Sequence, residues 1–168
     1  MSSLNENGAS PMTIRFAGRE DCATILSFIK SLAKYERLEN EVVSTAELLE
    51  EWLFDKRSAE VIFASVDGKE VGFALFFSSF STFLGRAGLY LEDLFILQEF
   101  RGRGIGSAML RKLAGIAVER EYGRMEWACL DWNTDGIEFY KSFGAEPKSD
   151  WTTFRLSGNT LREAAFGE

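Results

Sequence analysis

A glycine-rich segment with two arginines is the part of the sequence best suited to bind an anion. It reads Arg101-Gly102-Arg103-Gly104-Ile105-Gly106 and lies between a β-rich run and a helix-like pattern. Glycines let backbone amides approach a phosphate, a helix N-terminus adds free N–H groups, and the arginines add positive charge. The segment therefore predicts a phosphate-binding turn, although a plain strand-to-helix turn could share this composition.

The spacing of these glycines argues against two common nucleotide-binding motifs. The dinucleotide fingerprint needs a third glycine three positions after the second, and Met109 stands there instead. The Lys-Ser/Thr pair of an ATP-binding P-loop is also missing. We therefore expect neither NAD nor ATP at this turn.

The sequence contains no histidine, which excludes imidazole bases, Ser-His-Asp triads and histidine metal sites. Cys22 and Cys129 are far apart and form no Cys-x-x-Cys pair, so we expect no metal, no disulfide and a reducing, cytoplasmic location. Cys129 is expected to be a buried small hydrophobe in an apolar strand. Cys22 is expected to be structural, with a pKa lowered somewhat by a helix N-terminus. Proton transfer must then use carboxylates, Tyr, Lys or Cys.

The glycine-rich turn and three further segments together resemble one enzyme family. Arg101-x-x-Gly104-x-Gly106 is similar to the Arg/Gln-x-x-Gly-x-Gly/Ala signature of the GCN5-related N-acetyltransferases (GNAT). The other segments resemble its diamine acetyltransferase branch, which includes spermidine/spermine and thialysine acetyltransferases. They are Leu-Ala-Lys-Tyr-Glu at 32–36, Tyr-Leu-Glu-Asp at 90–93, and Asp-Trp-Asn at 131–133 followed by Phe-Tyr at 139–140.

This resemblance covers residues 12 to about 161 and implies the GNAT fold, an α/β fold with a mixed, mostly antiparallel central sheet flanked by helices. It also implies acetyl-CoA as the cosubstrate, with its pyrophosphate in the glycine-rich turn. The implied cofactor-binding residues are Leu94, Phe95, Ile96, Arg101, Gly102, Arg103, Gly104, Ile105, Gly106, Ser107, Asn133 and Tyr140.

Acetyl transfer to a primary amine needs carboxylates near the acceptor. An alkyl ammonium of pKa about 10.4 is almost fully protonated at pH 7, and forming the neutral amine costs about 4.6 kcal/mol. The resemblance implies that Glu92 accepts the proton, directly or through water, and that Tyr140 protonates the departing thiolate. The implied acceptor-binding residues are Tyr35, Glu36, Glu92, Asp93, Glu126, Trp127, Ala128 and Asp150.

Each of these residues also has a simpler structural interpretation. Glu92 and Asp93 are neighbours on one strand, so ordinary pleating points them to opposite faces. They could instead be a structural pair at a strand centre, held by salt bridges to cationic side chains. Tyr140 could be a core aromatic with a satisfied hydroxyl. The other acidic residues, taken singly, could be solvated surface charges.

One loop departs from the polyamine enzymes. Spermidine/spermine acetyltransferases carry an acidic-Pro-Trp sequence just before the Tyr-Leu-Glu-Asp strand. Residues 81–86 read Ser-Thr-Phe-Leu-Gly-Arg here, so the acidic residue is missing. The loop looks more like that of thialysine-type enzymes, which predicts short diamines or lysine-like amino acids as better acceptors than spermine.

The elements that must position these groups follow a mixed α/β order. Period-2 patterns and the hairpin signal Asp67-Gly68 predict strands, and helical spacing, a capping box from Ser44 to Glu47 and the helix stop Gly144 predict helices. The expected strands are 12–16, 61–66, 71–77, 89–97, 125–130 and 151–156. The expected helices lie around 25–33, from 44 to about 54, along 105–117 and over 134–143.

Composition limits the class of protein and its partners. A chain of 168 residues with 46% apolar residues is expected to form one domain, residues 12–168, after a disordered tail, residues 1–11. A net charge of −7 disfavours nucleic acid, and the apolar runs are too short for a membrane span. We expect a small amine partner and, from the resemblance, a homodimer. An N-acetyltransferase acting on peptides, or a non-catalytic acyl-CoA-binding homologue, is the alternative.

Overall fold

The computed structural model describes residues 12–167 of the chain, so the predicted tail at residues 1–11 lies outside the described part. The chain divides after Ala128 into two compact units, and each is described by itself. The first unit holds a five-stranded sheet, and the second holds two helices.

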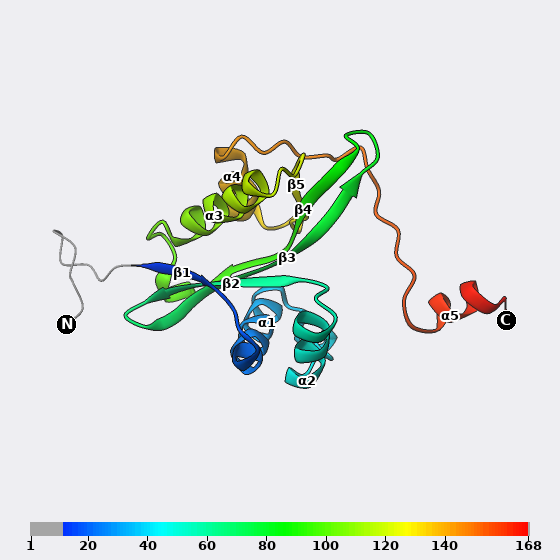
Figure 1. Cartoon of the computed structure of the whole chain (residues 1–168), viewed down its shortest axis with the longest axis horizontal. Coiled ribbons are helices and arrows are strands. Elements are labelled where there is room, and N and C mark those ends of the chain that lie inside the picture. The colour runs from blue at the N-terminus through cyan, green and yellow to red at the C-terminus, as the bar shows by residue number, and fades with distance from the viewer. Residues whose placement is uncertain (1–11, 168) are drawn as a thin grey trace. The chain divides into compact units, whose positions relative to one another are not determined.

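The sheet of the first unit runs in the order β1-β2-β3-β4-β5 (Figure 1). The first three pairings are antiparallel, and β4 pairs with β5 in parallel. The predicted mixed, mostly antiparallel sheet is therefore confirmed. The strands are β1 Thr13–Phe16, β2 Glu60–Val66, β3 Lys69–Ser81, β4 Arg86–Ile96 and β5 Met125–Trp127.

The turn between β2 and β3 has the predicted hairpin chemistry. Asp67 has φ 53° and Gly68 has φ 73°, so both central residues lie in the left-handed region. A two-residue turn of this kind matches the right-handed twist of the paired strands. The Asp-Gly signal thus fixes the register of the two strands beside it.

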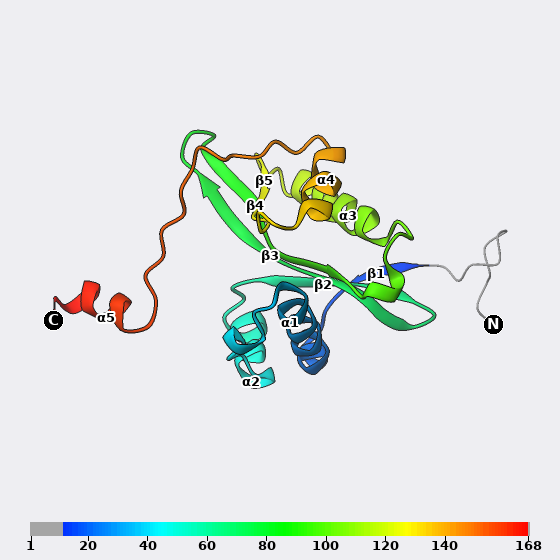
Figure 2. The same ribbon diagram turned by 180° about the vertical axis from the view of Figure 1, so that it is seen from behind.

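Helices cover both faces of this sheet (Figures 1 and 2). Helix α1, Cys22–Glu36, and helix α2, Ala46–Glu50, lie on one face, and a π-helical turn over Glu51–Asp55 continues α2. Helix α3, Ile105–Glu119, lies on the other face. Short 3-10 turns occupy Arg19–Asp21, Glu39–Glu41 and Gln98–Phe100.

Two apolar layers hold these helices to the sheet. On the α1 face, Phe28 stacks on Phe73 with ring centres 5.3 Å apart, within a buried cluster that also contains Ile25, Phe63 and Phe95. On the α3 face, the buried residues of α3 repeat at helical spacing: Ile105, Met109, Leu110, Leu113, Ile116 and Ala117. The sheet therefore has two distinct faces, called below the α1 face and the α3 face.

The second unit contains α4, Thr134–Ser142, and α5, Gly158–Phe166. Helix α4 ends before Gly144, whose φ of 81° fits the predicted helix stop. Helix α5 was not expected from the sequence.

Two expected boundaries and one expected strand are wrong. Thr45, not Ser44, caps α2, because its hydroxyl accepts a hydrogen bond from Leu48 N at 3.2 Å. β5 stops at Trp127 instead of residue 130. Residues 151–156 form no strand, because their alternating pattern favours an extended chain but no neighbouring strand pairs with them in the described part of the protein.

No described helix has both the length and the hydropathy needed to cross a bilayer. Among residues 12–167, no group of three or more Cys, Asp or Glu side chains is arranged to hold a metal ion.

Candidate active site

The glycine-rich turn forms an open, uncapped helix N-terminus. Gly102 has φ 73° and Gly104, the residue before α3, has φ 78°, a region that residues with a side chain rarely adopt. No side chain caps α3 in the described part of the chain, and Ala108 N donates to Gly104 O at 3.0 Å. The N–H groups of Ile105, Gly106 and Ser107 are thus left for a ligand, and the helix dipole favours an anion there.

The space beside the two glycines of this turn is open. A Cβ added at Gly102 or Gly104 would meet no atom within 4 Å. The glycines are therefore required by the backbone angles and leave the approach to the amides open. The residues present fit the pyrophosphate of acetyl-CoA.

The two arginines of the turn are held by the protein itself. Arg101 donates through Nε to Ile96 O at 2.9 Å, and its guanidinium carbon lies 4.5 Å from the Tyr35 ring centre. Arg103 donates to Glu99 O at 3.0 Å. Both guanidinium groups therefore fix the turn and add positive charge to it.

β4 has an edge on which a linear ligand could pair. Its parallel pairing with β5 covers only Leu89 to Leu91, although β4 continues to Ile96. On the β5 side, the backbone of residues 92–96 therefore has no strand partner among the described elements. Leu94, Phe95 and Ile96, which the resemblance implies for cofactor binding, all lie on this open stretch.

A β-bulge at Glu92 changes the direction of the two acidic residues of β4. On β3, Phe76 pairs with Leu91 and Leu75 pairs with Asp93, so Glu92 has no partner in the ladder. Residues that pair across two strands point to the same face, and consecutive residues of one strand point to opposite faces. Phe76 and Leu75 are consecutive on β3, so their partners Leu91 and Asp93 lie on opposite faces. Leu75 packs against the α1-face cluster, which places Asp93 on that face.

The bulge corrects the expectation that Glu92 and Asp93 point apart. Tyr90, the neighbour of Leu91, lies on the α1 face, and alternation from Tyr90 through Leu91 puts Glu92 there as well. Two adjacent carboxylates thus share one face, which ordinary pleating does not allow.

Glu36, Glu92, Asp93 and Glu126 form one electrostatic group, called below the acidic group. Burial, followed by the charges of Glu92 and Glu36, raises the pKa of Asp93 to about 7. Burial also raises the pKa of Glu36. The pKa of Tyr90 is raised by burial and then by the charges of Glu92 and Glu126, so these residues converge on the α1 face.

Most carboxylates of the acidic group have no ion-pair partner among the described residues. Glu126 pairs with Arg124 at 2.8 Å. Among residues 12–167, no lysine or arginine pairs with Glu36, Glu92 or Asp93. The arrangement therefore suits an incoming ammonium, whose positive charge would relieve the repulsion between the carboxylates.

Two of the three acceptor residues predicted at 126–128 lie apart from the acidic group. Trp127 is in register with Leu91, which is on the α3 face, whereas Glu126 is in register with Tyr90 on the α1 face. Ala128 follows the strand and is exposed. Of the three residues predicted at 126–128, Glu126 alone is tied to the acidic group by these observations.

The second unit carries the remaining predicted residues. The side-chain oxygen of Asn133 accepts from Gly136 N at 3.1 Å and caps α4, a role that sequence reasoning missed although Asn is a favoured cap. Tyr140 is partly buried on α4, with its ring 5.2 Å from that of Phe139. Asp150 is exposed in a turn after α4. Their roles toward cofactor and acceptor stay predictions.

The structure corrects the expected pKa direction of Cys22 and the expected strand position of Cys129. Cys22 is buried at the start of α1, and burial raises the pKa of its thiol instead of lowering it. Cys129 is only partly buried and lies beyond the end of β5, so it is not a strand residue.

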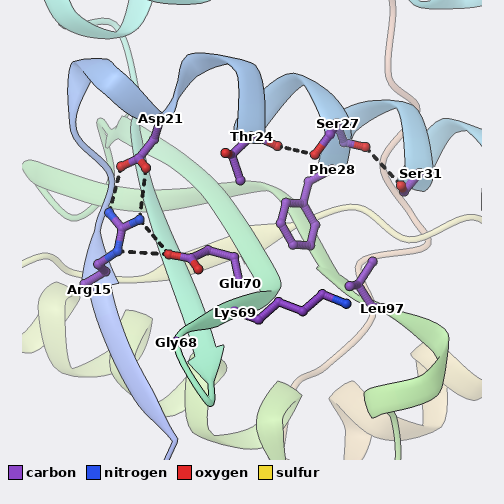
Figure 3. A pocket seen from close by; sticks show the side chains of 10 residues that line it. All are labelled: Arg15, Asp21, Thr24, Ser27, Phe28, Ser31, Gly68, Lys69, Glu70 and Leu97. Atoms are coloured by element: carbon purple, nitrogen blue, oxygen red, sulfur yellow. Dashed lines mark hydrogen bonds and ion pairs between the residues drawn. The ribbon is translucent and has the colours of Figure 1, made fainter.

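A separate hollow between α1 and the β2–β3 turn is a structural site (Figure 3). The Arg15 guanidinium donates to both carboxylate oxygens of Asp21, at 2.7 and 2.9 Å, and to Glu70 at 2.6 Å. The Arg15 partner lowers the pKa of Asp21, which is also bonded by Gly18 N. These groups satisfy one another and tie β1 and β3 to the start of α1.

Comparison with known proteins agrees with this geometry. A model of the acetyltransferase (GNAT) family matches residues 25–145. A Bos taurus protein named thialysine N-epsilon-acetyltransferase is 35% identical over 164 residues, covering 90% of this chain and 96% of that protein. A Homo sapiens protein named spermidine/spermine N(1)-acetyltransferase-like protein 1 is 31% identical over 166 residues, 92% of this chain and 24% of that protein.

Solved structures show the same fold. An integron cassette protein from V. cholerae superposes with a TM-score of 0.78 at 26% identity, covering 92% of this chain and 98% of that one. An aminoglycoside acetyltransferase from a soil metagenome superposes with a TM-score of 0.74 at 17% identity, covering 87% and 97%. The sheet, the uncapped turn before α3 and the matched segments therefore have one explanation: this chain belongs to the GNAT family of acetyltransferases.

Proposed function

We propose that this protein transfers the acetyl group of acetyl-CoA to a primary amine of a small cationic acceptor, by direct attack in a ternary complex. The observation that carries the proposal is the acidic group on the α1 face, which shares β4 with the open edge at residues 92–96. When bound, acetyl-CoA supplies an activated acyl group as a thioester. The amides of Ile105, Gly106 and Ser107 would hold its pyrophosphate.

The residues of this chain would then act on the acceptor and the leaving group. Carboxylates of the acidic group hold the ammonium and accept its proton, a role that the resemblance gives to Glu92. Backbone N–H groups of β4 stabilise the developing oxyanion. Tyr140, as the resemblance implies, protonates the thiolate.

The favoured acceptors are short diamines and lysine-like amino acids such as thialysine. The loop at residues 81–86 lacks the acidic residue of the polyamine enzymes, so a distant ammonium of spermine loses one anchor. An exposed charge contact is worth at most about 1 kcal/mol. The kcat/KM for short diamines or lysine-like amino acids should therefore exceed that for spermine several-fold. The relatives named for thialysine support the same choice.

We also propose that the protein is a single cytoplasmic GNAT domain that acts as a homodimer. The family resemblance supports the homodimer, and two cysteines that form no disulfide in the described part of the chain fit a reducing compartment. The net charge of −7 supports a cationic small molecule as partner in place of nucleic acid or an acidic membrane.

A panel of acceptors at fixed acetyl-CoA, followed by mass spectrometry, tests the proposal. It should contain thialysine, lysine, ornithine, putrescine, spermidine, spermine and a peptide with a free N-terminus. We expect a mass increase of one acetyl group on diamines and lysine analogues. Acetylation of the peptide alone would make this a peptide N-acetyltransferase, and acetylation of nothing would make it a non-catalytic homologue.

A further inference from the structure

The two carboxylates of the β4 bulge lie in different surroundings. Glu92 is exposed and unpaired in the ladder, so its side chain can move to meet a cation. Asp93 is partly buried, in register with Leu75 and on the same face as Phe95. Both of those apolar residues belong to or pack against the buried α1-face cluster. The shorter and more enclosed carboxylate is therefore Asp93.

The groups that face Asp93 are acidic or already engaged. Glu36 approaches from α1 and Glu92 from its own strand, and both carry like charge. The nearby Arg101 packs on Tyr35 and Phe95 and donates to Ile96 O. Arg124 is paired with Glu126. Within residues 12–167, the Asp93 carboxylate has no hydrogen-bond or ion-pair partner among the contacts described.

From this arrangement we infer that Asp93 is the catalytic base that takes the proton from the acceptor ammonium, while the neighbouring Glu92 holds the cation. The inference rests on the proposed function and replaces the role that the resemblance gives to Glu92. It uses the bulge directly, because without it the two carboxylates could not serve one amine from one face.

The protonation behaviour of Asp93 fits this role. Burial and the charges of Glu92 and Glu36 raise its pKa to about 7, close to the pH at which a general base works best. Below that pH the side chain is mostly protonated and cannot act as a base. An ammonium held by Glu92 favours the ionised form of Asp93, so acceptor binding should release protons near neutral pH.

The chemical step balances with these groups. One N–H bond of the ammonium breaks, its proton moves to an Asp93 oxygen, and the nitrogen lone pair attacks the thioester carbonyl carbon. The C–N bond forms, the nitrogen loses a second proton to solvent, and the C–S bond breaks. The thiolate takes up one proton, from Tyr140 in the proposed function. The proton held by Asp93 then returns to Tyr140 through solvent, which restores both groups, so one proton is released overall.

The pH dependence of kcat/KM for the best acceptor in the panel tests the assignment, using Asp93→Asn, Glu92→Gln and the remote control Asp67→Asn. We expect the parent and the control to show an acid limb near pH 7. Asp93→Asn should lower kcat about 100-fold or more and lose that limb. Glu92→Gln should raise KM for the amine about tenfold and keep the limb, moved to lower pH because one like charge is gone.

A titration of carbon-13-labelled aspartate carboxyls by NMR gives a readout besides activity. The signal missing in Asp93→Asn should titrate near pH 7 in the parent and lower in Glu92→Gln. Circular dichroism and coenzyme A affinity establish that each variant is folded.

Three outcomes overturn the inference. Loss of the acid limb in Glu92→Gln together with its retention in Asp93→Asn would make Glu92 the base. An Asp93 signal that titrates near pH 4 would remove the group poised for this role. If the unsubstituted protein acetylates no acceptor, the proposed function itself is overturned. If the unsubstituted protein is active and Asp93→Asn has the same kcat, only the role of Asp93 is overturned.

Discussion

The guanidinium carbon of Arg101 lies 4.5 Å from the centre of the Tyr35 ring. Arg101 belongs to the glycine-rich turn after β4, and Tyr35 is one residue before the end of α1. The next residue, Glu36, is part of the acidic group. One side-chain contact therefore joins the turn suited to the cofactor to the helix end suited to the acceptor.

Replacing Tyr35 by Leu should weaken coenzyme A binding without unfolding the protein. A partly exposed cation–π contact is worth about 0.5–1 kcal/mol, so we expect a two- to fivefold higher Kd by calorimetric titration. The matched control is Trp52→Leu, which removes the Lys56–Trp52 contact of 3.6 Å on the α2 side. Equal affinities for the parent and Tyr35→Leu would show that the contact does not position the turn.

Gly104→Val should weaken coenzyme A binding at least tenfold. A β-branched residue is strained at the φ of 78° found there, so the amides before α3 would be displaced. Gly115→Ala is the control, because it lies inside α3 with nothing within 4 Å of an added Cβ and should stabilise the helix by about 0.5–1 kcal/mol. An unchanged Kd for Gly104→Val in calorimetry would mean that the turn binds no pyrophosphate.

Tyr140→Phe should lower kcat about 100-fold and leave coenzyme A affinity within a factor of about two. The change removes a proton donor and keeps the ring against Phe139. Steady-state kinetics with the best acceptor checks it, beside Tyr122→Phe as a tyrosine of the other unit. A kcat within a factor of about three of the parent would make Tyr140 a packing residue.

Asp21→Asn should destabilise the protein at neutral pH by about 1–3 kcal/mol, since it breaks a bidentate contact with Arg15 and a bond from Gly18 N. The pKa of Asp21 is lower in the folded state than in the unfolded state. The stabilisation from Asp21 is therefore present above its unfolded pKa of about 3.9, and it is lost as the pH falls through its folded pKa. Urea unfolding at pH 7 and pH 3 should therefore show a smaller difference from the parent at the lower pH.

Asp55→Asn is the control for that measurement. Asp55 pairs with Arg19 at 2.6 Å, but both side chains are about half exposed, so its loss should cost well under 1 kcal/mol. If the two variants lose equal stability at pH 7, the hollow shown in Figure 3 has no special structural role.

Local chemistry in the sequence predicted much of the fold. The Asp67-Gly68 hairpin, the buried stripe of α3 and the helix stop at Gly144 depend on residues close together in the chain, and all three are confirmed. The strand expected at residues 151–156 is wrong because a strand needs a hydrogen-bonded neighbour that its own pattern does not supply. A short segment such as residues 151–156 does not determine whether a distant strand will pair with it.

The residue types of the candidate site were predictable from the sequence, but the directions of its side chains were less so. The glycine spacing identified the uncapped start of α3, and the family segments identified the acidic residues. The side chains of Glu92 and Asp93 were assigned to opposite faces because period-2 alternation assumes an unbroken ladder, and the unpaired Glu92 breaks it. The packing of Arg101 on Tyr35 likewise depends on residues 66 positions apart, which no local pattern reports.

The unpaired residue at Glu92 is an insertion in β4 that the two apolar layers do not need. Removing Glu92 would restore strict alternation and leave the ladder unchanged, because Leu91 would still pair with Phe76 and Asp93 with Leu75. Asp93 and Phe95 would stay on the α1 face, and Leu94 and Ile96 would stay on the α3 face. The bulge therefore adds a second carboxylate to the α1 face without moving a residue of either apolar layer.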